Sequence, residues 1–453
     1  MADRFIKEIE TNADSFGSIP FWSWNDSLEP EELRRQIRRM HELKMKGFFM
    51  HARGGLETAY MGEEWFHCVA ACAEEAAKLG MEAWLYDENG WPSGFAGGAL
   101  LKDPENYARF LRMEMKKEPD SEALCTYVKA ENKIKIVPNG EQIDGTEDYY
   151  CIYKGVCDTY VDTMNPAVTA KFIATTHEQY KKRFGNLFGK VIPGFFTDEP
   201  QYYRWATPWS DTLPEEFEKA YGYDIYSGLP ALFTDCEGAD EFRYDYWLLC
   251  HRLFTENFAR PIYEWAEANG CKITGHTIEE TSLSGQMWCT GGVMPFYQYE
   301  HIPGIDHLCR GIGGDLSPKQ VTSVAAQLGK KYILSETFAA CGWDVTPLEL
   351  KNIAQWQYAS GINRMCQHLY PYSIRGQRKT DYPCHYSEHL PWQDAMKDFN
   401  EYFNRLGAAL SAGREYVNAL AIHPMHSAYL KYRREEDANS IWELEDALGA
   451  FMG

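Results

Sequence analysis

Two short stretches decide the fold: Phe195-Phe196-Thr197-Asp198-Glu199-Pro200 and Ile333-Leu334-Ser335-Glu336-Thr337-Phe338. Each is an apolar, strand-like run that ends in a carboxylate. In a (β/α)8 barrel the groups that carry chemistry lie at the C-terminal ends of the strands. The two stretches therefore predict a barrel with Glu199 and Glu336 at its mouth.

Strand-like and helix-like segments alternate on both sides of these stretches. Apolar runs predict strands at residues 19–25, 47–53, 82–88, 191–198, 272–276, 304–308, 331–336 and 362–369. Helical spacing of apolar residues predicts intervening helices at 30–46, 63–79, 166–184, 241–269, 319–328 and 348–359. The strands are too apolar to face water on one side, as expected for a parallel sheet covered by helices. Eight strand–helix units in order predict an α/β fold, a closed (β/α)8 TIM barrel.

Two segments depart from the repeating pattern. Residues 116–162 are mixed in charge and rich in turn residues, which predicts a small β-rich insertion after the third strand. A closing helix is expected at 391–410, and residues 419–424 look like the first strand of another domain. We therefore predict a catalytic barrel over residues 1–412 and the start of a truncated or minimal C-terminal domain over 413–453.

Composition limits the possible partners. The 453 residues are 45% hydrophobic, which is enough for a large core, and carry a formal net charge of -21. Without a basic stripe, such a charge disfavours nucleic acid and anionic membrane surfaces as partners. A neutral ligand such as a sugar suits the chain better, and the 15% aromatic content agrees with sugar binding. The sequence does not determine the oligomeric state.

The cysteines and the N-terminus bear on localisation. No apolar run approaches the ~20 residues of a membrane span, and the first residues lack the pattern of a signal peptide. The 13 cysteines are odd in number, and none forms a Cys-x-x-Cys pair. Free thiols in a reducing compartment explain them better than disulfides or a zinc site. We therefore expect a soluble, cytoplasmic protein.

The two strand-end carboxylates suit one kind of chemistry. Cleavage of a glycosidic bond needs an acid for the leaving oxygen and a second carboxylate that acts as base or nucleophile. Glu199 and Glu336 fall on strands four and seven, on opposite sides of a barrel mouth. Asp198 beside Glu199 would raise the pKa of that carboxyl by like charge. One such residue alone would be a solvated or capping glutamate, but two at these positions favour a catalytic role.

Other strand ends add polar and aromatic groups to the same mouth, which predicts a hydroxyl-rich ligand. For each tryptophan among them, burial in the core is an equally good interpretation. The substrate-binding candidates are Trp24, His51, Asp87, Glu88, Trp91, Asp198, His276, Trp343 and His368. The sequence requires no cofactor, although Glu88, Glu279 and Glu280 could supply oxygen ligands to calcium.

Four motifs together resemble a known family. They are Phe21-Trp22-Ser23-Trp24-Asn25, Tyr86-Asp87-Glu88-Asn89-Gly90-Trp91-Pro92-Ser93-Gly94, Thr197-Asp198-Glu199-Pro200 and Ser335-Glu336-Thr337-Phe338-Ala339-Ala340-Cys341-Gly342-Trp343. In this order, over about residues 18–425, the chain resembles glycoside hydrolase family 106, the family of α-L-rhamnosidases. The resemblance implies an inverting mechanism, with Glu199 as general acid and Glu336 as general base. It also implies a calcium ion near the sugar site. Members of the family are longer, with β-sandwich domains after the barrel.

Three alternatives stay open at this point. The same pair could serve a retaining glycosidase, with Glu199 as acid/base and Glu336 as nucleophile. A barrel that binds carbohydrate without cleaving it would keep the same residues. A metal-dependent isomerase or lyase ranks last, because no helix carries a His-x-x-x-His pair or a comparable set of ligands.

Overall fold

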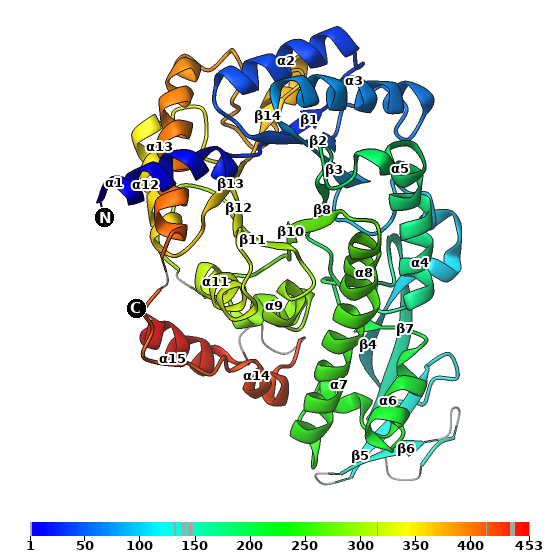
Figure 1. Ribbon diagram of the computed structural model, residues 1–453. Helices are drawn as coiled ribbons and strands as arrows, with labels where there is room; N and C mark the ends of the chain where they lie inside the picture. The colour runs from blue at the N-terminus through cyan, green and yellow to red at the C-terminus, as the bar shows by residue number, and fades with distance from the viewer. Residues whose placement is uncertain are drawn as a thin grey trace.

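A parallel sheet rolled into a barrel forms the centre of the molecule (Figure 1). The computed structural model describes residues 2–130, 133–137, 141–143, 148–314, 316–413, 415–434 and 440–452. The strand order is β13-β12-β11-β10-β8-β3-β2-β1-β14, with parallel pairing at every step. The strands are β1 (Phe21–Trp24), β2 (Gly47–Ala52), β3 (Glu82–Asn89), β8 (Gly194–Asp198), β10 (Lys272–His276), β11 (Ile302–His307), β12 (Leu334–Thr337), β13 (Arg364–Gln367) and β14 (Tyr370–Pro371).

Both ends of this sheet belong to one segment of chain. The predicted eighth strand is split into β13, which pairs with β12, and β14, which pairs with β1. The N–H of Ile19, just before β1, also donates to the carbonyl of Met365 on β13, at 2.8 Å. The segment 364–371 therefore closes the sheet, and the predicted TIM barrel is confirmed.

Helices cover the outside of the barrel, at positions close to those predicted. They include α2 (Pro30–Glu42), α3 (Glu63–Leu79), α4 (Pro166–Thr175), α5 (His177–Phe184), α7 (Ala239–Phe254), α8 (Arg260–Ala268), α11 (Leu316–Leu328), α12 (Pro347–Ala359) and α13 (Met396–Ser411). Local signals explain their ends: Pro30 opens α2, and Gly80 in the left-handed region ends α3. The predicted helix 166–184 is broken at Thr176, and a π-helical turn at Thr255–Ala259 separates α7 from α8.

Side-chain alternation divides the strands into two faces. The lumen is filled by an apolar layer that includes Phe21, Phe49, Phe196 and Leu334. Their neighbours in sequence, such as Trp22 and Phe195, point outward and pack under the helices. Because side chains alternate along a strand, the residue two positions beyond each lumen residue also points inward, one layer closer to the mouth.

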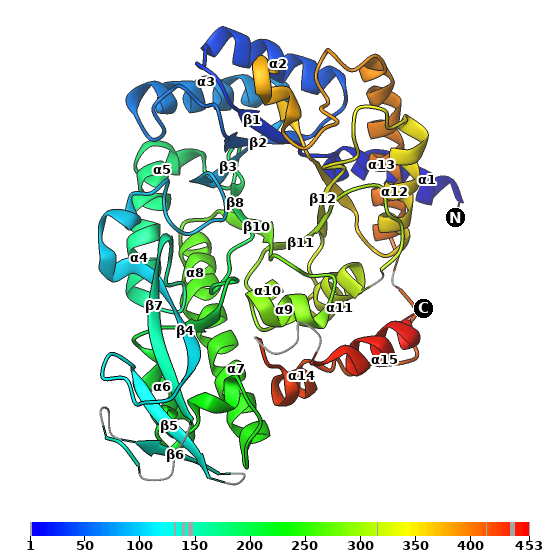
Figure 2. The same cartoon turned by 180° about the vertical axis from the view of Figure 1, so that it is seen from behind.

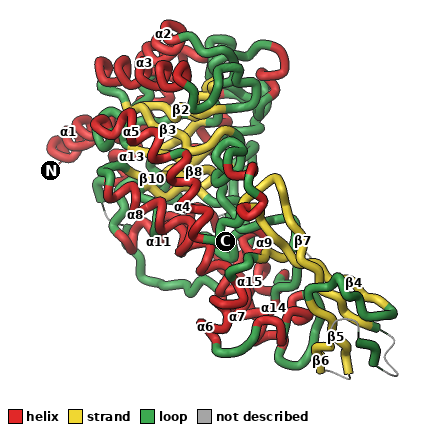
Figure 3. The backbone as a smooth tube through the Cα atoms, turned by 90° about the vertical axis from the view of Figure 1, so that its right-hand side faces the viewer, coloured by secondary structure: helices red, strands yellow, loops and turns green. Residues whose placement is uncertain are grey.

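The predicted insertion is a second, antiparallel sheet that projects from the barrel (Figures 1 and 3). Its strands are β4 (Tyr107–Lys116), β5 (Cys125–Ala130), β6 (Lys133–Val137), β7 (Tyr149–Val161) and β9 (Thr207–Trp209). It begins at Tyr107, earlier than the predicted residue 116, and residues 131–132, 138–140 and 144–147 of the predicted segment lie outside the described residues. The strand β9 comes from a later loop and pairs with β4. This pairing ties the loop that follows β8 to the insertion.

The C-terminal region departs from the sequence prediction. Residues 419–424 do not form the predicted strand and pair with no strand in the described part of the chain; residues 419–422 are exposed, and His423 and Pro424 are half-buried. Two helices follow, α14 (Met425–Lys431) and α15 (Trp442–Met452). The helix α14 packs against α7 and α9 (Leu283–Cys289), as Figure 2 shows from behind. None of the helices in the described ranges is long and apolar enough to cross a membrane.

Candidate active site

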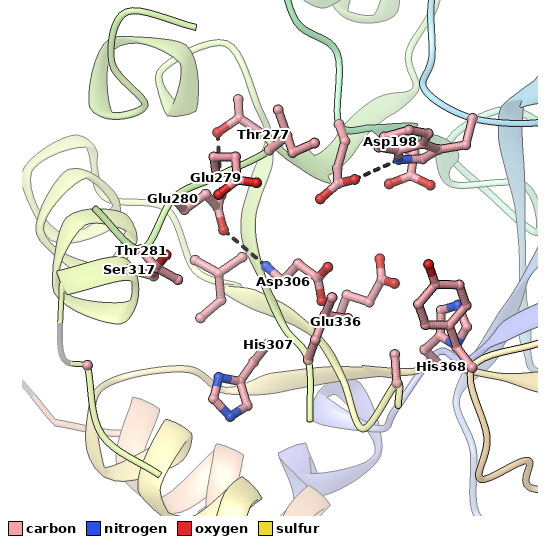
Figure 4. A pocket seen from close by; sticks show the side chains of 18 of the residues that line it. Asp198, Thr277, Glu279, Glu280, Thr281, Asp306, His307, Ser317, Glu336 and His368 are labelled. Atoms are coloured by element: carbon pink, nitrogen blue, oxygen red, sulfur yellow. Dashed lines mark hydrogen bonds between the residues drawn. The ribbon is translucent and has the colours of Figure 1, made fainter. Parts of the chain in front are cut away.

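A cavity of about 770 Å³ opens at the C-terminal ends of the barrel strands. The same alternation places polar side chains on the floor of this cavity. Two positions beyond the lumen residues Phe196, Leu334 and Cys366 lie Asp198, Glu336 and His368. Figure 4 shows the side chains of Asp198, Asp306 and Glu336 around the same space. The barrel mouth therefore carries a dense group of carboxylates.

Glu199 enters the cavity through an unusual backbone conformation. It directly follows β8 and has a φ of 47°, in the left-handed region that residues other than glycine rarely adopt. Its N–H donates to the carbonyl of His276 at 3.1 Å, and its Oε2 accepts a hydrogen bond from Nε1 of Trp91 at 2.6 Å. A strained backbone that is held from two sides is typical of functional sites.

His276 connects the two predicted catalytic residues beneath the cavity. Its Nε2 lies 2.8 Å from Oε2 of Glu336 and 3.6 Å from Oδ1 of Asp198, and its Nδ1 lies 3.9 Å from Oε1 of Glu199. The histidine is completely buried. Glu199 and Glu336 therefore lie on either side of one imidazole, as their places on β8 and β12 predict.

The local environment changes the protonation of this group. Burial raises the pKa of Glu199 well above its ordinary value, and the nearby Asp306 and Asp198 raise it further. Burial also raises the pKa of Glu336, to about 7, although the hydrogen bond and charge of His276 oppose the shift. The pKa of His276 is raised well above its ordinary value, because the hydrogen bond to Glu336 and the surrounding carboxylates outweigh the effect of burial. The arrangement favours a protonated Glu199 and an ion pair between His276 and Glu336.

Glu88 and Asp87, which were predicted to bind the ligand, do not line the cavity. The Glu88 carboxylate is fully buried and accepts hydrogen bonds from five backbone N–H groups, those of Asn89, Gly94, Phe95, Ala96 and Gly97. Asp87 points outward from β3, because Tyr86 points into the lumen, and it accepts bonds from Ser93 and Thr197. Both carboxylates shape the turn after β3, and neither lines the cavity.

The structure separates the other predicted substrate-binding residues into three groups. Trp91, Asp198 and His368 line the cavity, together with Glu199 and Glu336. His276 lies beneath it, and the ring of His51 is buried 3.7 Å from that of Tyr86. Trp24 and Trp343 lie outside the cavity lining: Trp24 points outward into the core, 4.8 Å from the ring of Trp65, and Trp343 lies on the surface beside His385.

Several residues that line the cavity or bond to its lining were not singled out from the sequence. Tyr86 donates to Asp198 at 2.6 Å, and Asp381 forms a two-pronged ion pair with Arg53, with both N–O distances at 2.9 Å. Arg204 lines the cavity from the loop after β8. The aromatic run Tyr202-Tyr203-Arg204-Trp205, so close to Glu199, was the signal that could have identified it. Asp381 had no such signal, because it comes from a distant loop.

The residues predicted to bind calcium do not form a common site. Glu88 is occupied by backbone N–H groups, whereas Glu279 and Glu280 line the cavity. The only group in the described part of the chain whose donor atoms lie close enough for an ion, within 4.8 Å of one another, is Asp198, His276 and Glu336. Calcium prefers oxygen ligands only, so this mixed set does not fit it. Calcium near the sugar site therefore stays a prediction, and no step of the reaction is derived through it.

Comparisons with known proteins bear on the family and the fold of this chain. The sequence model of glycoside hydrolase family 106, described as alpha-L-rhamnosidase, matches residues 137–430. A protein of Formosa agariphila named "Putative beta-glucuronidase" is 25% identical over 248 residues, which are 52% of this chain and 20% of that protein. A rhamnosidase structure from Novosphingobium sp. PP1Y superimposes with a TM-score of 0.68 at 12% identity, over 90% of this chain and 61% of that one.

These comparisons differ in what they support. The structural likeness, at 12% identity, supports the barrel fold. The chain spans a fifth of the length of the curated relative and about three-fifths of the rhamnosidase. The family match contains the motifs around Glu199 and Glu336, while the two earlier motifs lie before it. With its barrel and both carboxylate motifs in place, the chain belongs to glycoside hydrolase family 106, the alpha-L-rhamnosidase family.

Proposed function

We propose that this chain is the catalytic barrel of an inverting glycoside hydrolase that removes a terminal α-L-rhamnosyl residue or a similar neutral sugar. The observation that carries the proposal is the placement of His276 between the carboxylates of Glu199 and Glu336 on the cavity floor. Membership of the family supports the sugar. The partner is thus a carbohydrate, and the chemistry is hydrolysis.

Glu199 is suited to act as the general acid. Burial raises its pKa, so it holds a proton near neutral pH. The hydrogen bond from Trp91 to Oε2 fixes the carboxyl group and leaves Oε1 to carry the proton. In the reaction, this proton passes to the glycosidic oxygen as the bond from that oxygen to the sugar breaks.

Glu336 is suited to act as the general base. Its carboxylate is held by the hydrogen bond from His276, whose raised pKa keeps the imidazole charged. An ionised Glu336 can take a proton from a water molecule on the opposite face of the sugar, and that water attacks the anomeric carbon. The second product is then the free sugar with inverted anomeric configuration.

The retaining alternative uses the same two residues in another way. There Glu336 would attack the anomeric carbon itself and form a covalent intermediate, with carboxyl groups about 5–5.5 Å apart rather than about 6.5–9.5 Å. The hydrogen bond from His276 to one oxygen of Glu336 leaves the other oxygen free, which suits either role. The anomer that first appears by proton NMR distinguishes the two: β-L-rhamnose from an α-L-rhamnoside supports inversion, and the α anomer supports retention.

The test is hydrolysis of p-nitrophenyl α-L-rhamnoside by the wild type and by Glu199→Gln and Glu336→Gln. We expect each substitution to lower kcat by about 10²- to 10⁴-fold, the usual contribution of a general acid or base. Glu215→Gln, an exposed glutamate on α6 (Leu213–Tyr221), is the control and should keep full activity. Binding of rhamnose without any turnover would favour a carbohydrate-binding barrel. Near-normal rates in either catalytic variant would contradict the assignment.

A further inference from the structure

The rim of the cavity carries an arginine in an unusual setting. The guanidinium carbon of Arg204 lies 4.7 Å from the ring centroid of Trp91 and 4.5 Å from that of Trp205. Stacking on aromatic faces leaves the N–H groups at the edge of a guanidinium available to a ligand. Trp205 itself is 67% exposed, so one of the two rings also faces solvent.

Arg204 makes no hydrogen bond or ion pair with any residue in the described ranges. The other arginine of the cavity, Arg53, is engaged by both oxygens of Asp381. A chain with a net charge of -21 has many carboxylates to offer, and six of them line this cavity: Asp198, Glu199, Glu279, Glu280, Asp306 and Glu336. The positive charge of Arg204 is therefore available to a ligand in a cavity that would otherwise repel anions.

The position of Arg204 relative to the catalytic residues indicates which part of a substrate it meets. Trp91, the ring beneath Arg204, donates its indole N–H to Glu199. Glu199, as the general acid, must contact the oxygen of the leaving group. An arginine one ring away from Glu199 therefore faces the leaving group rather than the sugar whose anomeric carbon reacts.

The loop that carries Arg204 is anchored on both sides. The N–H of Tyr202 donates to the carbonyl of Cys289 at 3.0 Å, and the ring of Tyr203 stacks on Phe110 of β4 at 5.3 Å. Immediately after it, β9 pairs with β4. A guanidinium held by such a loop loses little conformational freedom when it binds a ligand, which favours a preformed subsite.

We propose that Arg204, between Trp91 and Trp205, forms a leaving-group subsite for an acidic sugar, and that its guanidinium binds the carboxylate of a hexuronic acid. This inference rests on the proposed function, because it assigns the leaving-group side from the role of Glu199. A carboxylate matches the planar fork of arginine with two parallel hydrogen bonds. The exposed ring of Trp205 offers a face for the C–H side of the same sugar.

The test compares two disaccharides in which α-L-rhamnose is linked to galacturonic acid or to galactose, which differ only at the carboxylate. We expect the wild type to favour the acidic disaccharide about 10- to 100-fold in kcat/KM, the range of a charge-assisted hydrogen bond. Arg204→Gln should abolish this preference, because KM rises much more for the acidic disaccharide than for the galactose disaccharide. Arg204→Lys, which keeps the charge without the fork, should give an intermediate preference. Arg112→Gln, on β4 of the insertion, is the matched control and should behave like the wild type.

Two results would overturn the proposal. One is an equal rate of the wild type on both disaccharides. The other is an equal loss on both substrates in Arg204→Gln, which would mean that Arg204 only positions Trp91 and Glu199. Hydrolysis of p-nitrophenyl α-L-rhamnoside reports separately on the proposed function. If that substrate is not cleaved, calorimetry with the two disaccharides still decides the subsite: binding of the acidic one, lost in Arg204→Gln, supports it, and equal or no binding refutes it.

Discussion

At the scale of single residues, His276 governs the protonation of the site. Burial raises the pKa of Glu336, and the hydrogen bond and charge of His276 oppose this rise. The resulting pKa is about 7. As the proposed base, Glu336 must be ionised, so kcat/KM should fall as the pH drops through about 7. As the proposed acid, Glu199 must be protonated, so the alkaline side of the profile should follow its raised pKa.

The substitution His276→Gln tests this arrangement. Without the positive charge, the pKa of Glu336 rises, so the acidic side of the pH–rate profile should move to higher pH. At pH 7 we expect kcat/KM to fall on the order of 10-fold or more. Part of the loss should be recovered at higher pH, where Glu336 is ionised again. A profile of unchanged shape with a uniformly lower rate would mean that His276 only supports the fold.

The residue scale also shows what the sequence could predict about the site. Glu199 and Glu336 were identifiable because strand ends of a barrel meet at one mouth, whatever the separation in sequence. The role of Glu88 was not predictable, since a carboxylate that collects five backbone N–H groups looks the same in sequence as a metal ligand. Arg204 was missed because its significance depends on two rings that only the fold brings around it.

At the scale of elements, the turn after β3 holds the C-terminal end of β8 in place. The hydroxyl of Ser93 donates to Asp87 at 2.6 Å and accepts the N–H of Asp198 at 2.8 Å. The N–H of Ser93 also donates to the carbonyl of Asp198. Two elements that follow different strands are thereby locked together, and Trp91 of the turn is held against Glu199.

Trp24 and Trp91 were both predicted to bind substrate, but substitutions at Trp24 should affect stability and those at Trp91 should affect catalysis. Trp24 is completely buried under the helices, so Trp24→Ala should lower the free energy of unfolding by about 3–5 kcal/mol, and Trp24→Phe by less. Neither should change KM if the protein folds. Trp91→Phe removes the indole N–H and one of the two fused rings from a side chain that is 40% exposed, so we expect nearly normal stability but a kcat lower on the order of 10-fold. Denaturant unfolding and steady-state kinetics on the three variants measure both effects, and a KM defect in Trp24→Phe would contradict this division.

Element boundaries were predictable where the chain marks them locally. The helix α3 has the predicted bounds, because two glutamates open it and Gly80 closes it. The predicted strand at 419–424 failed because an apolar run becomes a strand only beside a partner, and in the described part of the chain this segment has none. The split of the eighth strand was equally hidden, since it follows from the need to pair with both β12 and β1.

At the scale of the whole molecule, the barrel joins parts that lie far apart in sequence. The segment 364–371 closes it, and the buried guanidinium of Arg364 pairs with Glu82 on β3 at 2.8 Å. The insertion contributes β4, and the loop after β8 contributes β9 to the same sheet. The loop that carries Arg204 therefore depends on the insertion as well as on the barrel. The sequence predicted the barrel and the insertion separately, but not this connection.

The C-terminal helices provide the last prediction, because their contacts tie them to the barrel. Tyr429 donates to the carbonyl of Gly291 at 2.6 Å, and the carbonyl of Tyr432 accepts the indole N–H of Trp247 on α7 at 3.2 Å. Both tyrosines are buried, so Tyr429→Ala should lower the melting temperature of the barrel itself rather than of a separate unit. Calorimetry should show one cooperative transition in the wild type, displaced as a whole in the variant. Two transitions, with only the smaller one displaced by Tyr429→Ala, would instead support the predicted independent domain that begins near residue 413.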